Sequence, residues 1–506
     1  MTPNQYTPEE PISSIATALA PAALGIIRVS GKNCIELVSK VFSRPKALLE
    51  AAGNTLVYGW IVDEQKIDEV MLAVYRAPKS FTGEDMVEIF CHGGPAVVTA
   101  IQNLMLKIGF RQANRGEYTF RAYINGKTDL TKAEAIKEII DSHTDVSRSH
   151  AAGRLSGSLY KEIDSIKKLI VDTLAAIEVE IEYPEDEETI ADSFDRKDIE
   201  SAISRLQNLV DSWKSEKLYQ DGARVVLAGC TNAGKSSLFN AILKEERAIV
   251  SDIEGTTRDW LESWASINGI PVRLFDTAGL RQTDDVIEAK GVEISRSLAK
   301  DADVVLYLVD GTGGLNEEDK AFIENCREPL VLVYTKCDLS AEAQGIAQSA
   351  GQISGVLGDA KNDVQPSGKD TATINTNVPL GEGVAENAAS AAVAARGRLS
   401  PPSSVKISSK TGVGMAELYA QITKILTAGN STEREQAGLG SARQKEAVAE
   451  ALECTKHALV SADDNYTLDA VVQDLEDALD ALGEVTGDVT PDDVLGSIFA
   501  NFCVGK

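Results

Sequence analysis

A glycine-rich stretch in the middle of the chain has the residue types and spacing of a phosphate-binding loop. It reads GCTNAGKSS, spans Gly229 to Ser237, and fits the pattern G-x-x-x-x-G-K-[ST]. The glycines let backbone N–H groups curl around phosphates, while Lys235 can reach the β- and γ-phosphates and Ser236 can ligate magnesium. RVVLA before it predicts a strand and SLFNAIL after it predicts a helix, which is the context that this loop requires.

Three further motifs follow in the order of a guanine-nucleotide site, each after a predicted strand. In DTAG, Asp276 can hold magnesium through water and Gly279 can sense the γ-phosphate. In TKCD, Asp338 can accept from the two N–H donors on the edge of guanine, a pattern that adenine lacks. SSK, at Ser408 to Lys410, can close over the base. Thr335 stands where most GTPases have Asn, so we expect guanine selectivity to be kept with a weaker base contact.

The group that orients the attacking water differs from that of Ras-like switches. Those proteins place a Gln directly after the DxxG glycine, whereas this chain has Leu280, which cannot orient water. GTTRD, at Gly255 to Asp259, is a candidate for the first switch, with Thr257 expected to ligate magnesium. Asn232 in the phosphate loop can offer its amide oxygen to a cation that bridges the phosphates. Such a cation would supply the charge that an arginine finger gives elsewhere.

An α/β domain must position these motifs, and the pattern of the chain predicts one between two helical blocks. Residues 1–125 alternate strand and helix signals and predict an α+β domain, and 126–222 are helical. Residues 223–428 contain short apolar strands typical of a parallel sheet covered on both faces, and 429–506 are helical again. We infer one helical domain, discontinuous in sequence, into which the α/β domain is inserted.

Local signals support parts of this division. TKAE, at Thr131 to Glu134, has the pattern of a capping box that starts a helix. Residues 341–400 contain no aromatic residue and are rich in Ala, Gly, Ser and Asn, which predicts a disordered low-complexity insertion within the α/β domain. One long apolar stripe at helical spacing predicts a bundle helix; its members are Ile163, Ile166, Ile170, Leu174, Ile177 and Ile181.

Composition limits the class of protein. Hydrophobic content is 43% and charged content 25%, as in an ordinary globular protein, and no apolar run reaches transmembrane length. The acidic N-terminus lacks the apolar core of a secretory signal, so we expect no membrane anchor. Seven scattered cysteines fit a reduced cytosol and argue against zinc. The net charge of -27 does not attract a polyanion, so a nucleic acid substrate requires a local patch or a basic partner.

Cys503, near the end of the sequence, raises the alternatives of a lipidation signal, a reactive thiol or a packed side chain. The spacing matches a prenylation box, but Gly505 is not aliphatic and a final Lys506 is not a usual specifier. The reactive and packed alternatives stay open. An apolar stripe predicts that the last helix is docked; it comprises Leu495, Ile498, Phe499 and Phe502.

Taken together, the chain resembles the MnmE family (also called TrmE), the GTPases that modify the wobble uridine of certain transfer RNAs. The resemblance covers nearly the whole chain and depends on FTGEDMVEIFCHGGPAV, GCTNAGKSSLFNAIL, DIEGTTRD, DTAGLR and the final FCVGK. It implies a multidomain α/β plus α fold: an N-terminal α+β folate-binding domain, a discontinuous helical domain and an inserted Ras-like P-loop G domain. The insertion at 341–400 has no counterpart in this resemblance.

The resemblance also implies an activity. Members of the family are potassium-activated GTPases whose G domains dimerise. With the flavoprotein partner MnmG, which supplies FAD, they add a carboxymethylaminomethyl-type group to C5 of the wobble uridine. A reduced folate, 5-formyl- or methylene-tetrahydrofolate, is the one-carbon donor. We therefore expect a cytoplasmic homodimer that forms a heterotetramer with MnmG and acts on transfer RNA.

The family's functional residues fall on matching positions of this chain. Glu288 matches the residue that orients the attacking water, and Cys503 belongs to the tail motif that is expected to take part in modification. Magnesium is expected at Ser236 and Thr257, and potassium at Asn232, Ser251, Ile253 and Thr256. The residues expected to bind folate are Arg28, Glu88, Lys127 and Lys506. The carboxylate of Glu88 can pair with the donors of the pterin, and the three cations can pair with the carboxylates of the folate. The residues expected to contact GTP are Asn232, Ala233, Gly234, Lys235, Ser236, Ser237, Ser251, Asp252, Ile253, Glu254, Gly255, Thr256, Thr257, Asp276, Thr277, Ala278, Gly279, Thr335, Lys336, Asp338, Ser408, Ser409 and Lys410.

An alternative function is a GTPase switch in ribosome assembly, similar to Era or Der. That class shares the G-domain motifs but explains neither FTGED nor FCVGK. It predicts a basic RNA-binding module beside the G domain, of which the composition gives no strong sign. Binding of a reduced folate discriminates between the two functions, while the amine donor and the recognised transfer RNAs stay open.

Overall fold

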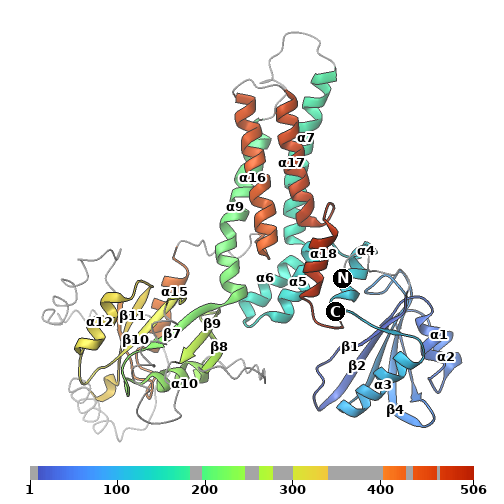
Figure 1. The fold of residues 1–506 in the computed structure, drawn as a ribbon, viewed down its shortest axis with the longest axis horizontal. Helices are drawn as coiled ribbons and strands as arrows, with labels where there is room; N and C mark the ends of the chain where they lie inside the picture. The colour runs from blue at the N-terminus through green and yellow to red at the C-terminus, as the bar shows by residue number, and fades with distance from the viewer. Residues whose placement is uncertain are drawn as a thin grey trace, which may run out of the picture. The chain divides into compact units, whose positions relative to one another are not determined.

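The chain is divided into two compact units, which are described separately here (Figure 1). The first consists of Met1–Ser142, Arg148–Glu216 and Glu433–Lys506, and the second of His143–Ser147 and Lys217–Thr432. The predicted fold class, an α+β domain and a discontinuous helical domain with an inserted α/β domain, is confirmed. A computed structural model describes residues 10–182, 196–245, 261–276, 300–339, 403–428, 437–463 and 468–505.

The first unit begins with a six-stranded sheet in the order β3-β4-β5-β2-β1-β6. Neighbouring strands are antiparallel except β1 and β6, which are parallel. Helices α1 (Cys34–Ser39), α2 (Pro45–Leu49) and α3 (Pro95–Lys107) pack on one face and form a core with its inward side chains. The strands are β1 (Ile12–Ile15), β2 (Ala22–Ser30), β3 (Thr55–Val62), β4 (Lys66–Tyr75), β5 (Met86–Gly93) and β6 (Arg111–Gln112).

The opposite face of this sheet carries large exposed apolar side chains. Tyr58 on β3 is opposite Met71 on β4, and the two are 53% and 45% exposed. Leu56 on β3 and Leu24 on β2 are also exposed, while their strand neighbours Val57 and Gly25 are buried. Because side chains alternate between the faces of a strand, these residues form an outward surface of the sheet.

Long helices from two separate segments build the helical part of the first unit. Figure 1 shows α7 and α9 alongside α16 and α17, and their apolar faces share one core. The stripe predicted on α7 is confirmed at Ile163, Ile166, Ile170 and Ile177, which are fully buried. Leu174 is half-buried, and the side chain of Ile181 lies outside the described residues. Over the described part of the chain, no helix combines the length and apolar character needed to cross a membrane. The helices are α4 (Glu117–Ile124), α5 (Leu130–Asp141), α6 (Asp145–Leu155), α7 (Ser158–Glu182), α9 (Arg196–Asp221), α16 (Ala442–Asp463), α17 (Leu468–Thr486) and α18 (Asp492–Ala500).

The capping box predicted at Thr131 is wrong. Helix α5 begins at Leu130, and Asp129 is its N-cap, whose carboxylate accepts from the backbone N–H of Lys132 at 3.0 Å. The Thr131 hydroxyl donates to the same carboxylate. The acid two residues earlier therefore takes the capping position, because its carboxylate satisfies a donor of the first helical turn.

The second unit is built on a six-stranded sheet in the order β12-β11-β10-β7-β9-β8. Its neighbours are parallel except β8, which is antiparallel to β9. Apolar cores lie on both faces, as the continuous apolar strands predicted. The elements are β7 (Ala223–Ala228), α10 (Lys235–Glu245), β8 (Leu261–Ile267), β9 (Ile270–Asp276), β10 (Val304–Asp310), α12 (Glu317–Asn325), β11 (Leu330–Thr335), η3 (Cys337–Leu339), β12 (Ser403–Lys406) and α15 (Met415–Leu426). The insertion predicted at 341–400 lies outside the described residues.

Candidate functional site

The glycine-rich loop connects the central strand β7 to helix α10, and its backbone requires particular residue types. Gly229 has φ +134°, and a Cβ there would lie 2.3 Å from the carbonyl oxygen of Leu308 on β10. Gly234 has φ +94°, and Asn232 has φ +64°, a conformation that Asn tolerates better than most residues. The sequence spacing thus corresponds to a turn that starts next to β10 and ends at the N-terminus of α10.

Two polar contacts organise the phosphate side of this loop. Lys235 Nζ donates to the carbonyls of Gly229 at 2.7 Å and Cys230 at 2.9 Å, and so closes the loop around its own ammonium group. The Ser236 hydroxyl donates at 3.0 Å to the carboxylate of Asp276, which is buried at the end of β9. A hydroxyl and a carboxylate held together are oxygen ligands of the kind that Mg²⁺ prefers. The residues present therefore fit a magnesium site.

Thr335 joins the guanine motif to the phosphate loop. Its side chain is buried, and its hydroxyl lies 2.8 Å from the carbonyl oxygen of Ala233 and 3.3 Å from that of Val309. A Cβ on Gly234 would touch Thr335 at 3.6 Å, so the two segments are in direct contact. The residue that departs from the usual Asn thus has a visible role as a tether of the phosphate loop.

The loops expected around guanine are joined through their backbones. Asp338 lies in the short helix η3, and the N–H of Cys337 donates to the carbonyl of Ile407 at 3.2 Å. Ser408 follows and is buried, and its N–H donates to Val413 at 2.9 Å. The structure therefore brings the TKCD and SSK motifs together at one edge of the sheet. The next two residues of SSK differ in exposure: Ser409 is half-buried and Lys410 is exposed.

Asp310, at the end of β10, belongs to this region although no sequence motif predicted it. Its carboxylate pairs with Lys336 Nζ at 2.6 Å and accepts from the N–H and hydroxyl of Thr312. These contacts, that of Lys336 first, lower the pKa of Asp310 to about 2. Lys336 is held at φ +56°, so the ion pair fixes a lysine in an unusual backbone conformation. In the sequence, the signal for Asp310 is its position as the acidic last residue of the predicted strand VVLYLVD.

Several predicted residues of the nucleotide site lie outside the described residues. They include the switch segment, most of DTAG and the residue expected to orient water. The magnesium, potassium and water-orienting roles assigned to them stay predictions. The set is Ser251, Asp252, Ile253, Glu254, Gly255, Thr256, Thr257, Thr277, Ala278, Gly279 and Glu288, and the folate residue Lys506 also lies outside.

A second polar cluster lies on the sheet of the first unit, around Arg28 and Glu88. The two residues are register partners on β2 and β5, and Arg28 donates to one Glu88 oxygen from Nε at 3.0 Å and from Nη2 at 2.7 Å. Tyr75 donates to the other oxygen at 3.2 Å. We expected the carboxylate and the guanidinium to meet different parts of a folate. The structure pairs them with each other, so the guanidinium is already neutralised.

Arg28 is also enclosed by aromatic rings and by a distant part of the chain. Its guanidinium carbon lies 5.7 Å from the ring centroid of Phe81 and 5.6 Å from that of Tyr118. Its Nη1 donates at 3.1 Å to the carbonyl of Gly505. Lys127 is exposed and donates instead to the carbonyl of Pro78, at 3.0 Å, in the loop that leads into FTGED.

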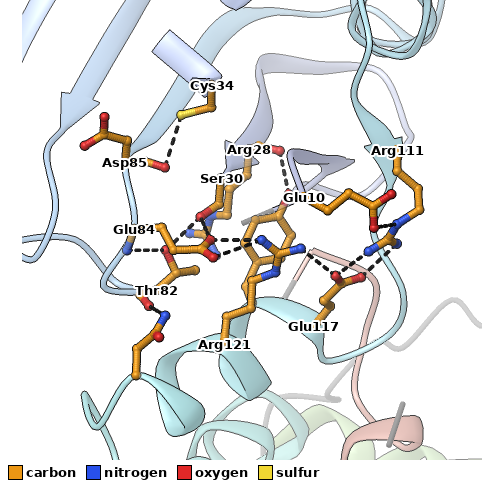
Figure 2. Close-up of polar contacts among 12 residues, drawn as sticks. Glu10, Arg28, Ser30, Cys34, Thr82, Glu84, Asp85, Arg111, Glu117 and Arg121 are labelled. Carbon is orange, nitrogen blue, oxygen red and sulfur yellow. Dashed lines mark hydrogen bonds and ion pairs between the residues drawn. The ribbon is translucent and has the colours of Figure 1, made fainter. Parts of the chain in front are cut away.

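A buried charge network holds the FTGED loop, as Figure 2 shows. Arg121 is fully buried and donates to both oxygens of Glu84, at 3.1 and 3.0 Å, and to Glu117 at 2.9 Å. Ser30 on β2 donates to Glu84 and bonds Thr82. Buried charges are costly unless paired, so this network fixes the loop to β2 and α4. The ring of Phe81, next to Thr82, stays 38% exposed.

The docking of the last helix is confirmed. The Phe499 ring meets the Phe120 ring edge-on, with centroids 5.3 Å apart, and both are buried together with Phe502. Cys503 follows, and its carbonyl accepts from the N–H of Gly116 at 3.4 Å while the residue itself is exposed. Of the two alternatives left open for this thiol, packing is therefore not supported.

Comparison with known proteins assigns the whole chain to one family. The chain matches a model of the GTP-binding protein TrmE N-terminus over residues 11–127 and a model of the MnmE helical domain over residues 130–503. It is 47% identical over 512 residues to the tRNA modification GTPase MnmE of Treponema denticola, covering 99% of both chains. The corresponding identities are 43% for Treponema pallidum, covering all of both chains, and 38% for Borrelia turicatae, covering 99% of this chain and 100% of the other. The chain belongs to the MnmE (TrmE) family of tRNA modification GTPases.

Proposed function

We propose that this chain hydrolyses GTP and uses hydrolysis to drive the modification of transfer RNA. The observation that carries the proposal is the single site formed by the phosphate loop, the Ser236–Asp276 contact and the Thr335 tether. The full-length relatives named as tRNA modification GTPases support the coupling. The Era/Der-like alternative leaves the Arg28 cluster and the FTGED network without a role.

In this proposal each described residue of the nucleotide site has a defined task. Lys235 binds the β- and γ-phosphates, Asp338 binds the edge of guanine, and Ser236 with Asp276 holds magnesium. Bound magnesium neutralises charge on the phosphates. Leu280 cannot orient water, and the family resemblance implies that Glu288 takes that role.

Potassium completes the phosphate side of the site. Asn232 can offer its amide oxygen to the ion. This residue lies in the phosphate loop and has a left-handed backbone conformation, with φ +64°. Ser251, Ile253 and Thr256 are the remaining potassium ligands that the family resemblance implies. With Thr257 on magnesium, these residues would bring the first switch onto the phosphates.

The Arg28 cluster is proposed as the site of a reduced folate. Glu88 is held by Arg28 and Tyr75 on the sheet, so its carboxylate is oriented before a ligand arrives. A carboxylate in this setting can accept from the amide and amino donors of a pterin. Lys127 and Lys506 are then the cations for the folate's carboxylates, because Arg28 is committed to Glu88.

The partners follow from the same proposal. We expect a homodimer, for which the exposed apolar residues on the open face of the N-terminal sheet offer a contact surface. The flavoprotein MnmG is expected to supply FAD. Because the net charge is -27, binding of transfer RNA requires a local basic patch or a basic partner surface. The scattered cysteines support a cytoplasmic setting.

Mass analysis of wobble uridines tests the function in cells. A strain that lacks this gene should accumulate unmodified uridine at the wobble position, and the wild-type chain should restore modification. Asp338→Asn, which removes the acceptor for guanine, should not restore it. Normal wobble uridines in the deletion strain would reject the proposal. Defective ribosome assembly with normal uridines would favour the Era/Der-like alternative.

A further inference from the structure

Gly505 occupies a position that admits no side chain. It is buried with φ +96°, and a Cβ there would lie 2.8 Å from the carbonyl oxygen of Ile15 and 3.1 Å from the Cα of Ala16. These are backbone atoms of β1 and of the residue after it. Strand β1 is paired with β2 on one side and β6 on the other, so it cannot move away. Both the space and the backbone conformation therefore demand glycine.

The two residues directly before Gly505, Cys503 and Val504, are fixed by their backbones rather than by their side chains. Val504 forms an antiparallel bridge with Arg115, and the Cys503 carbonyl accepts from the N–H of Gly116. The side chains of Cys503 and Val504 are exposed. We call residues 501–505 the tail segment. Its path is anchored at one end by the buried ring of Phe502 and is set beyond that by main-chain contacts and by the conformation of Gly505.

This path ends at the guanidinium of Arg28. The Gly505 carbonyl accepts from Nη1 at 3.1 Å, on a different nitrogen from the two that donate to Glu88. A guanidinium is planar and its donors lie in a fixed fork, so binding on both sides fixes the whole group. The orientation of the Glu88 carboxylate thus depends on an acceptor that comes from the opposite end of the sequence.

We propose that Gly505 is a positioning residue for the reduced-folate site. Its left-handed turn presents its carbonyl to Arg28, and Arg28 in turn holds Glu88 in the orientation that receives the pterin donors. The inference rests on the proposed folate function of the Arg28 cluster. Gly505 itself does not bind the pterin; it acts through Arg28.

The proposal predicts a defect that is confined to one site. In Gly505→Ala the methyl group meets the backbone of β1, so the tail segment must leave its path and Arg28 loses an acceptor. The two large cores, of the helical bundle and of the sheet, contain no residue of the tail segment, and Phe502 is held separately by Phe499 in the small core beneath α18. The variant should therefore fold, melt as wild type does, and hydrolyse GTP normally while binding folate poorly.

Binding of 5-formyltetrahydrofolate to the full chain, measured by isothermal titration calorimetry, tests this. Loss of a hydrogen bond to a charged group should raise the dissociation constant of Gly505→Ala roughly tenfold or more. Val504→Ala is the matched control, because that side chain is exposed in the same segment, and its dissociation constant should equal that of wild type. Thermal unfolding and GTP turnover should be unchanged in both variants.

The double variant shows whether Gly505 acts through Arg28. If it does, Arg28→Ala with Gly505→Ala should bind folate no more weakly than Arg28→Ala alone. Equal folate binding by wild type and Gly505→Ala would overturn the positioning role and leave the folate site intact. Independent, additive losses would also overturn it. If the wild-type chain binds no folate, the proposed function of the cluster fails, and this inference fails with it.

Discussion

The hydroxyl of Thr335 lies 2.8 Å from the carbonyl oxygen of Ala233, and this hydrogen bond joins the guanine loop to the phosphate loop. The bond is buried, and the same hydroxyl also lies 3.3 Å from the carbonyl of Val309 on the neighbouring strand. In the proposed function the two loops bind opposite ends of a nucleotide, and this bond would then couple recognition of the base to the shape of the phosphate loop.

Removing this hydroxyl should weaken nucleotide binding. Thr335→Val keeps the shape of the side chain but removes the one hydrogen that the hydroxyl donates toward the carbonyls of Ala233 and Val309, so we expect a loss of about 1–1.5 kcal/mol, or roughly tenfold in affinity. Binding of a fluorescent GDP analogue measures it. Thr335→Ser retains the hydroxyl and should bind nearly as wild type does. Wild-type affinity in the Val variant would show that the tether has no energetic role.

Potassium should be required for hydrolysis. Leu280 cannot orient water, and Asn232 is available as a cation ligand in the phosphate loop. Replacing potassium with sodium should slow GTP turnover sharply, because sodium is too small to span the same ligands. Asn232→Ala should lose the difference between the two salts. Equal rates of the wild-type chain in potassium and sodium would contradict this proposal.

Cys503→Ser should separate modification from hydrolysis. The thiol is exposed on the tail segment, whereas the nucleotide loops belong to the other unit. Serine nearly matches the shape of cysteine but lacks the nucleophilicity of a thiolate. We expect loss of wobble uridine modification in cells with near-normal GTP turnover in vitro. Full modification by this variant would mean that the tail acts through its backbone and not through the thiol.

Burial should make the stability of the helical domain depend on pH through Glu138. This residue accepts from Arg154 Nε at 2.8 Å, but Arg154 is shared with Glu216, and burial raises the pKa of Glu138 to about 7. The folded chain then binds this proton more tightly than the unfolded chain does. The proton on Glu138 therefore stabilises the folded chain. This stabilisation is fully present below the ordinary pKa of a glutamate and is lost as pH rises through about 7.

We expect the free energy of unfolding to fall by at most about 1.4 kcal/mol per pH unit between roughly pH 5 and pH 7. Urea denaturation followed by far-ultraviolet circular dichroism measures it across this range. Glu138→Gln should flatten the profile, because the amide does not titrate. Asp141→Asn is the matched control on the same helix, since Asp141 is exposed and its pair with Lys137 contributes little. A wild-type slope in Glu138→Gln would show that other groups set the pH dependence.

Features with local signals in the sequence were predicted well. The phosphate loop is defined by a few residues between a strand and a helix, and the apolar stripes of α7 and α18 repeat within single helices. The discontinuous helical domain followed from the same periodicity in two blocks. Such patterns can be recognised without knowledge of the tertiary fold, because a helix that buries one face repeats apolar residues at every turn.

Features that depend on register or on distant contacts were not predicted. Arg28 and Glu88 were assigned separate roles, since only the pairing of β2 with β5 places them side by side. The Gly505 contact joins residues from opposite ends of the sequence, and no pattern reports such a distance. The predicted start of α5 was wrong for a more local reason. Two possible capping residues lie two positions apart, and the carboxylate of Asp129, not the hydroxyl of Thr131, caps the helix.

The division of the helical domain has a consequence for how the chain is made. Helix α7 leaves the ribosome long before its partner helices α16 and α17, because the whole second unit is translated between them. At ordinary synthesis rates the interval is on the order of ten seconds or more. During that time the apolar stripe of α7 lacks the cover of α16 and α17, and the inserted domain can already fold. The growing chain should therefore need a chaperone at this stage, and pausing within the second unit would prolong its exposure.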